Sequence, residues 1–131
     1  METEMDKTFD NKRLVGALGE EAAAEYLKKK GHAILERNFR YSRLGEIDII
    51  SREKSGICFI EVKTRSSTRY GYPREAVNNK KQNNIRRLAQ IYLSKNKIKD
   101  TDVRFDVVEV YIKKYDNKLE VSKIFLIENA F

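Results

Sequence analysis

Apolar and polar residues follow one another along this chain in two different periods, which predict helices and strands in turn. Apolar positions spaced by three and four predict helices at about 12–30 and 75–95. Alternation with period two predicts five strands, at 33–39, 45–50, 59–63, 103–112 and 119–127. The order α-β-β-β-α-β-β indicates one α/β domain over 12–131, with a central mixed five-stranded sheet flanked by helices. Residues 1–11 carry few apolar anchors and are expected to form a flexible tail.

The first predicted helix has two apolar sectors on a helical wheel, and they lead to opposite expectations for one acid. One sector carries Leu14, Val15, Leu18, Ala22 and Tyr26. The other carries Gly16, Ala17, Ala23, Ala24 and Leu27, with Glu20 at its centre. If these small residues approach the sheet, Glu20 is carried inward; if they face solvent, Glu20 is an ordinary surface acid. Periodicity favours neither arrangement.

Two neighbouring predicted strands, 45–50 and 59–63, carry acidic residues that are expected to meet. A turn centred on residues 54 and 55 would place Asp48 directly opposite Glu61. Opposed carboxylates on paired strands repel each other, so a cation between them would stabilise the pair. Apolar residues on both faces of the two strands indicate a central, covered position in the sheet.

This pair of carboxylates suits a hard divalent ion. Mg²⁺ takes oxygen ligands, commonly one or two carboxylates together with waters and substrate phosphates. Asp48 and Glu61 would bind it, the backbone carbonyl of Val62 is a further candidate ligand, and Glu20 could hold a metal-bound water. Lys63 would orient that water or stabilise the charge of a phosphodiester transition state. Mn²⁺ is the expected substitute for Mg²⁺.

The alternative is a hairpin that needs no metal. The same register places Glu46 opposite Lys63, and two cross-strand charge interactions would then balance the face. The residue pattern alone does not distinguish a metal site from a metal-free hairpin.

Basic residues are in excess and gather after the hairpin. The chain has 27 Lys and Arg against 20 Asp and Glu, a net charge of +7, which favours nucleic acid as the partner. The candidates for contact with nucleic acid are Arg65, Arg69, Tyr70, Arg74, Lys80, Arg86 and Arg87. The tyrosines of 64–74 have a second interpretation, as a surface loop that covers the edge of the core. Lys81 falls on the buried stripe of the second helix, where it either reaches the rim or faces a negative group.

Single residues limit the other chemistries. Cys58 is the only cysteine, so no internal disulfide forms and a buried, inert thiol is expected. His32, the only histidine, is expected to be a partly exposed turn residue with no catalytic partner nearby. The chain shows neither the order of a signal peptide nor a membrane-spanning run, so a cytoplasmic location without membrane association is expected.

Asp48 and the tripeptide Glu61-Val62-Lys63 resemble the motif of the PD-(D/E)xK nuclease superfamily, with Ile47 in place of the motif's proline. The wider sequence resembles the YraN-like family of small bacterial proteins. The segments that carry this resemblance are Gly16 and Gly19-Glu20, 38–40, 45–48, 59–65, Gly71 and Pro73, 76–77 with Lys81-Gln82, 104–108 and 128–131. Together they extend over nearly all of the chain from residue 13 onward.

The resemblance implies a restriction-endonuclease-like fold, similar to that of archaeal Holliday-junction resolvases. In those enzymes a glutamate on a helix joins the motif, which adds Glu20 to the catalytic set. Lys81 and Gln82 look like polar positions that some branches carry on the following helix, and with Glu46 they would surround the site. Resolvases act as symmetric dimers, so a homodimer is also implied.

The expected function is a metal-dependent endonuclease that hydrolyses phosphodiester bonds in DNA, in preference to RNA, on branched or damaged structures. The alternatives are a nucleic-acid-binding protein that keeps the nuclease fold without cleaving, and a partner-binding scaffold whose tyrosine loop is the interface.

Overall fold

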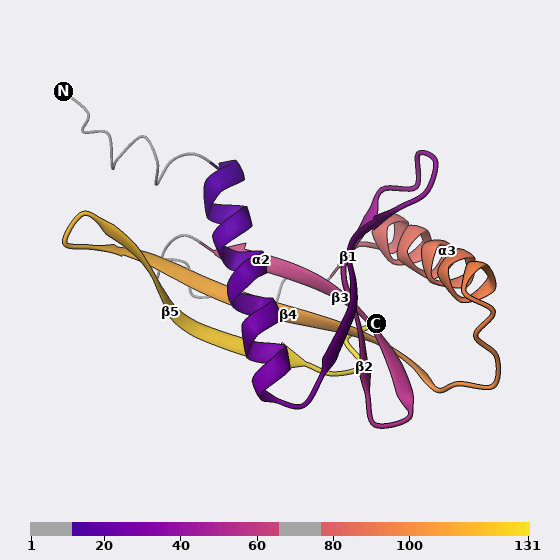
Figure 1. The fold of residues 1–131 in the computed structure, drawn as a ribbon. Coiled ribbons are helices and arrows are strands. Elements are labelled where there is room, and N and C mark those ends of the chain that lie inside the picture. Colours follow the sequence, from indigo (N-terminus) through magenta and orange to yellow (C-terminus); the bar gives the residue numbers. More distant parts are fainter. Residues whose placement is uncertain (1–11, 66–76) are drawn as a thin grey trace.

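The computed structural model describes residues 12–65 and 77–131, which form two helices and five strands. In chain order these are α2 (Lys12–Lys29), β1 (Ala33–Arg40), β2 (Glu46–Glu53), β3 (Gly56–Arg65), α3 (Asn79–Lys95), β4 (Val103–Tyr115) and β5 (Lys118–Ile127) (Figure 1). The predicted α/β class and element order are confirmed. The predicted tail, 1–11, lies outside the described residues.

All five strands belong to one mixed sheet with the order β1-β2-β3-β4-β5. Its pairings are antiparallel except that of β3 with β4, which is parallel. A parallel pair needs a crossover, and α3 lies in it. The β4–β5 hairpin extends past α2 at one end of the molecule (Figure 1).

The helix α2 packs on one face of the sheet through small residues. Its buried side chains include Ala23, Ala24 and Leu27, which join a core cluster with Ile60 of β3 and Val108 of β4. The face toward the sheet draws on both predicted sectors, since Val15 of the first sector is buried in the same cluster and Ala17 of the second is exposed. Glu20 belongs to the second sector, and its side chain is only 17% exposed.

The helix α3 covers the opposite face, where Ile85, Leu88 and Tyr92 pack on Phe59 in a second core cluster. Its predicted start at about 75 was too early, since Val77 and Asn78 precede the helix. Asn78 is the N-cap, and its side chain accepts a hydrogen bond from the backbone N–H of Lys81 at 2.8 Å.

The strand β2 does not alternate as regularly as the sequence predicts. Period two would place Ile47 and Ile49 on one face, but Ile47 belongs to the cluster under α3 and Ile49 to the cluster under α2. The pairing partners on either side of Asp48 are Ile47 with Phe39 and Ile49 with Arg37. Asn38, between Arg37 and Phe39, has a φ of 55° in the left-handed region, and the β1–β2 register shifts between Ile34 and Glu36.

His32 is buried, contrary to the expectation of a partly exposed residue. The residue is 4% exposed, and its Nδ1 lies 2.8 Å from the hydroxyl of Ser51, which is itself fully buried. Burial lowers the pKa of His32, and the nearby charge of Glu53 only partly opposes this. A hydroxyl sealed in this way cannot reach a substrate, so the pair is part of the core. Cys58 is buried, as predicted.

Two glycines three residues apart in α2 are expected to respond to alanine with opposite signs. A methyl group at Gly16 would meet no atom within 4 Å, so Gly16→Ala should stabilise the fold by about 0.5–1 kcal/mol. A methyl group at Gly19 would overlap the side chain of Thr64, and Gly19→Ala should cost about 1–2 kcal/mol despite its better helix propensity. Urea unfolding of both variants checks this pair; equal effects would contradict the close contact of α2 with β3.

Among residues 12–65 and 77–131, neither helix has the length and apolar character needed to cross a bilayer.

Candidate functional site

A cavity of about 400 Å³ lies between the first half of α2 and the strands β2 and β3. The residues that line it are Arg13, Gly16, Ala17, Glu20, Glu46, Asp48, Glu61, Val62 and Thr64. The structure therefore brings together the four acids and the backbone position that the sequence suggested. Three separate elements supply them: the β2–β3 hairpin shows Glu46, Asp48, Glu61 and Val62 in one local window, whereas Glu20 comes from α2.

Asp48 lies where the pairing of β2 with β3 ends. The register agrees with the prediction as far as Ile49 and Ile60, the last paired residues. Beyond them Asp48 is not simply opposite Glu61, because its Oδ2 accepts a hydrogen bond from the backbone N–H of Val62 at 2.8 Å. The Asp48 side chain thus accepts a hydrogen bond from the Val62 N–H, which has no partner on β2 beyond the end of the pairing. This bond holds the carboxylate at the cavity.

Burial and neighbouring charge both act on Asp48. Loss of hydration is the largest effect and the Glu61 carboxylate the next, and together they raise the pKa of Asp48 to about 8. Glu20 and Glu46 contribute in the same direction, whereas the bond from Val62 opposes them. A carboxyl that resists ionisation at neutral pH lies in a place where positive charge is favoured.

Glu61 is 6% exposed, and its two oxygens differ. Oε1 accepts a hydrogen bond from Nζ of Lys81 on α3 at 2.7 Å. Oε2 has no hydrogen-bond partner within the described parts of the chain. Partial burial lowers the pKa of Lys81, but the bond to Glu61 and the charges of Glu61, Asp48 and Glu46 outweigh it and raise that pKa overall. Of the two expectations for Lys81, a negative partner is the one that the structure shows.

The strand β1 supplies partners for the two outer acids. Oε1 of Glu20 lies 3.5 Å from Arg37, and its Oε2 accepts a hydrogen bond from Asn38 at 3.1 Å. Glu46 pairs with Arg40 at 3.0 Å, so the part of the metal-free alternative in which Glu46 neutralises Lys63 does not hold. The signal for these partners was the polar end of the first predicted strand, which the sequence shows but does not connect to the acids.

Lys63 takes a different position from the other motif residues. It is half-buried on β3, in register with the buried Glu109 of β4. Within residues 12–65 and 77–131 its side chain makes no hydrogen bond or ion pair, and it is not among the residues that line the acidic cavity.

The remaining candidates divide into three groups. Gln82 donates a hydrogen bond to the backbone carbonyl of Val77 at 2.6 Å, so it holds the entry to α3 and does not reach the acids. The half-buried Arg86 lies over the rings of Phe105 and Phe131 and does not belong to an outward basic face. The exposed basic candidates are Lys80 and Arg87, and Arg65 lies half-buried at the end of β3. Three further candidates, Arg69, Tyr70 and Arg74, lie outside the described residues.

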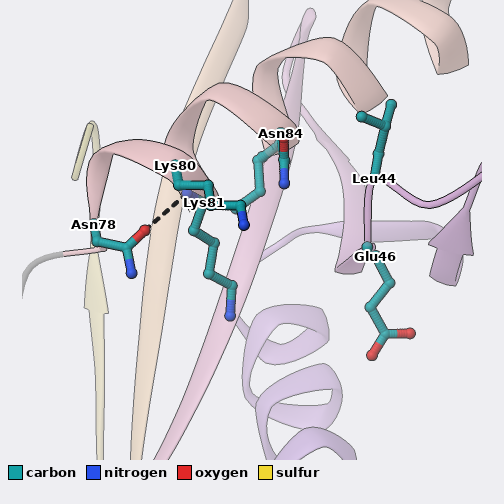
Figure 2. Close-up of a pocket in the computed structure, with 8 residues that line it drawn as sticks. Leu44, Glu46, Asn78, Lys80, Lys81 and Asn84 are labelled. Carbon is teal, nitrogen blue, oxygen red and sulfur yellow. Dashed lines mark hydrogen bonds between the residues drawn. The ribbon is translucent and has the colours of Figure 1, made fainter.

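A second cavity, of about 280 Å³, adjoins the acidic one and shares Glu46 with it. Figure 2 shows Asn78, Lys80, Lys81 and Asn84 on the α3 side and Leu44 and Glu46 on the other. Two lysines therefore stand beside the acids, and one of them, Lys81, reaches from this cavity to Glu61.

The donor set fits a magnesium-like ion and not a dense metal cluster. Within the described ranges no three His, Cys, Asp or Glu side chains are close enough together to hold a metal. Mg²⁺ however needs only one or two carboxylates and completes its shell with waters and phosphate. Asp48, Glu61 and the carbonyl of Val62 meet that need, and the buried Oε2 of Glu61 offers an acceptor without a protein partner.

The chain is similar in sequence to many bacterial proteins of about the same length. A UPF0102 protein of Acetivibrio thermocellus is 66% identical over 122 residues, which cover 93% of this chain and 94% of that protein. Those of Caldicellulosiruptor saccharolyticus and Caldanaerobacter subterraneus are 51% and 47% identical over 121 residues each, covering 92% of this chain and 99% and 97% of the relatives. A family model described as "Uncharacterised protein family UPF0102" matches residues 19–110. The chain therefore belongs to the family UPF0102.

Proposed function

We propose that this protein is a metal-dependent endonuclease that hydrolyses phosphodiester bonds in DNA. The observation that carries the proposal is the meeting of Asp48 and Glu61 in one cavity. One carboxyl has a pKa of about 8, and the other has a buried oxygen without a hydrogen-bond partner among the described residues. A bound divalent cation would remove both costs, and in a basic protein the polyanion that accompanies it is nucleic acid.

Each residue of the site has a distinct part in the proposed reaction. Asp48 and Glu61 would hold the metal, with the carbonyl of Val62 as a further candidate ligand. Mg²⁺ held there would lower the pKa of an attacking water and offset the charge of the phosphate. Glu20, at the α2 wall of the cavity, accepts a hydrogen bond from a water and orients it. Lys63 follows Glu61 by two residues on β3 and would stabilise the transition-state charge from outside the cavity lining.

The likeness of Asp48 and Glu61-Val62-Lys63 to the PD-(D/E)xK motif supports this proposal, as does the location of both parts on neighbouring strands. The proposal has three further parts. The protein is a member of that superfamily, it prefers DNA to RNA, and its substrate is branched or damaged DNA.

A second candidate is a nucleic-acid-binding protein that does not cleave. The position of two lysines favours it, because Lys81 already neutralises Glu61 and Lys63 does not line the acidic cavity. Such a protein would keep the basic surface and use the acids for structure.

Incubation with duplex, single-stranded, flap and four-way DNA in Mg²⁺ or Mn²⁺ separates the two candidates. Wild type should cut at least one substrate, and Asp48→Ala, Glu61→Ala and Lys63→Ala should cut it about 100-fold more slowly or worse, since even outer partners of a metal site cost 10–100-fold. The matched control is Glu120→Gln, an exposed acid on β5. DNA binding without cleavage by wild type would favour the binding protein, and equal cleavage by the alanine variants would overturn the assigned site.

A further inference from the structure

Lys81 is the cation that the structure pairs with Glu61, one of the two central carboxylates. Its Nζ lies 2.7 Å from Oε1 of Glu61, and the charges of Asp48 and Glu46 also act on it. It comes from α3, on the face of the sheet opposite to α2, so it approaches the acids from the side away from Glu20. A positive charge is therefore already present at the position where a metal ion would help most.

The backbone of Lys81 is fixed by a hydrogen bond, whereas its side chain is partly exposed to solvent. Asn78 caps the helix at the Lys81 N–H, whereas 47% of the Lys81 side chain is exposed and it lines the second cavity beside Lys80 and Asn84. Figure 2 shows the long side chain running from the first turn of α3 along this cavity. The four-carbon stem is flexible, so rotation about it would carry Nζ from Glu61 into the second cavity with no change of the main chain.

We propose that Lys81 is the resident counter-ion of the site: it neutralises Glu61 while no metal is bound, leaves when a divalent cation binds, and then contacts a DNA phosphate in the adjoining cavity. The inference rests on the proposed function, because it takes Asp48 and Glu61 as the metal ligands. In this proposal the second cavity binds the part of the DNA backbone that lies next to the scissile bond.

Electrostatics gives the expected size of the effect. An ammonium group in contact with Glu61 and a divalent ion bound to the same carboxylate repel each other across a few ångströms, in surroundings only partly screened by water. The protein must displace Lys81 before it binds the ion. Removal of the ammonium group should therefore tighten metal binding by about tenfold or more.

The first test is calorimetric titration with MgCl₂ at pH 8.5 without DNA. Lys81→Met should bind Mg²⁺ about tenfold more tightly than wild type, while Lys81→Arg, which keeps the charge, should behave like wild type. Lys99→Met removes the same charge from an exposed site in the connection after α3 and should have no effect. Unchanged or weaker Mg²⁺ binding by Lys81→Met would overturn the inference.

The second test measures DNA affinity by fluorescence anisotropy with a short labelled strand, in CaCl₂ and in EDTA. With Ca²⁺ bound, Lys81 is free for the phosphate, so Lys81→Met should weaken binding several-fold. In EDTA Lys81 is tied to Glu61, and the variant should bind DNA like wild type. An equal loss in both conditions would mean that Lys81 is an ordinary phosphate contact.

The two levels of the proposal fail in different ways. If Asp48→Asn and Glu61→Gln bind Mg²⁺ as wild type does, the metal site of the proposed function is wrong. If they lose Mg²⁺ and wild type cleaves DNA, but Lys81→Met binds Mg²⁺ as wild type does, only the role of Lys81 is wrong.

Discussion

Replacement of Arg104 by methionine is expected to destabilise the protein by about 3–5 kcal/mol, because it leaves a buried carboxylate without its counter-charge. Asp106 is fully buried on β4, and both of its oxygens accept hydrogen bonds from Nε of Arg104 at 2.9 Å. Its other partner is the backbone N–H of Asn129 at 3.0 Å, which ties the C-terminal segment to the sheet. Burial raises the pKa of Asp106 even with both partners in place.

The double variant Arg104→Met with Asp106→Leu is the informative control. A buried ion pair that is replaced as a whole by apolar side chains commonly costs little, whereas loss of one partner costs the full burial of the other. Urea unfolding followed by circular dichroism should show most of the lost stability restored in the double variant. If the single and double variants lose the same amount, Arg104 stabilises the fold through Glu53, 3.0 Å away, and not through Asp106.

Asp48→Asn is expected to stabilise the protein by roughly 3 kcal/mol at pH 8.5 while it removes the proposed metal ligand. Burial, and then the charge of Glu61, raise the pKa of Asp48 to about 8 from an ordinary value of 3.8. Between these values the folded state holds a proton that the unfolded state releases. This contribution to stability is complete below pH 4 and is lost as the pH rises through 8. Water that reaches the half-buried carboxyl reduces the full linkage value.

Unfolding in EDTA at several pH values between 4 and 9 tests this expectation. The asparagine side chain can still accept the hydrogen bond from Val62, so the two proteins should be equally stable near pH 4 and diverge as the pH rises. Glu120→Gln, on the exposed side of β5, should follow wild type throughout. A difference that does not depend on pH would show that the carboxylate ionises normally, which would weaken the case for a cation at this site.

The register of the central hairpin could be predicted because it depends on local information. A short turn fixes which residues pair, and the pairs Ile49–Ile60 and Ile50–Phe59 follow from it. The inward face of α2 could not be chosen in this way. Small residues suit close packing and also suit an exposed helix, and only tertiary contacts, such as the approach of Gly19 to Thr64, decide between them.

The features that sequence reasoning missed depend on distant partners or on one unusual backbone conformation. The left-handed φ of Asn38 is a feature of the backbone, which the pattern of apolar and polar side chains does not reveal. His32 can be buried because its ring forms a hydrogen bond with Ser51 of β2, which is distant in the sequence. Arg86 was expected outward, but the rings of Phe105 and Phe131 hold its guanidinium. The start of α3 was the exception, since Asn78 is a good N-cap residue that the sequence displays.

The parallel pairing of β3 with β4 has a consequence for how the chain folds. The strands β1, β2 and β3 follow one another as hairpins, and β4 with β5 forms another, so these contacts close short loops. The β3–β4 pairing instead joins residues such as Glu61 and Val107, far apart along the chain, and must bear the entropy of closing that long loop. We therefore expect the rate-limiting step of folding to be the docking of two preformed hairpin units, β1–β2–β3 and β4–β5. The helix α3, which connects them along the chain, would pack on the sheet in the same step. In that case Asp48 and Glu61 share a unit and approach each other before the sheet is complete.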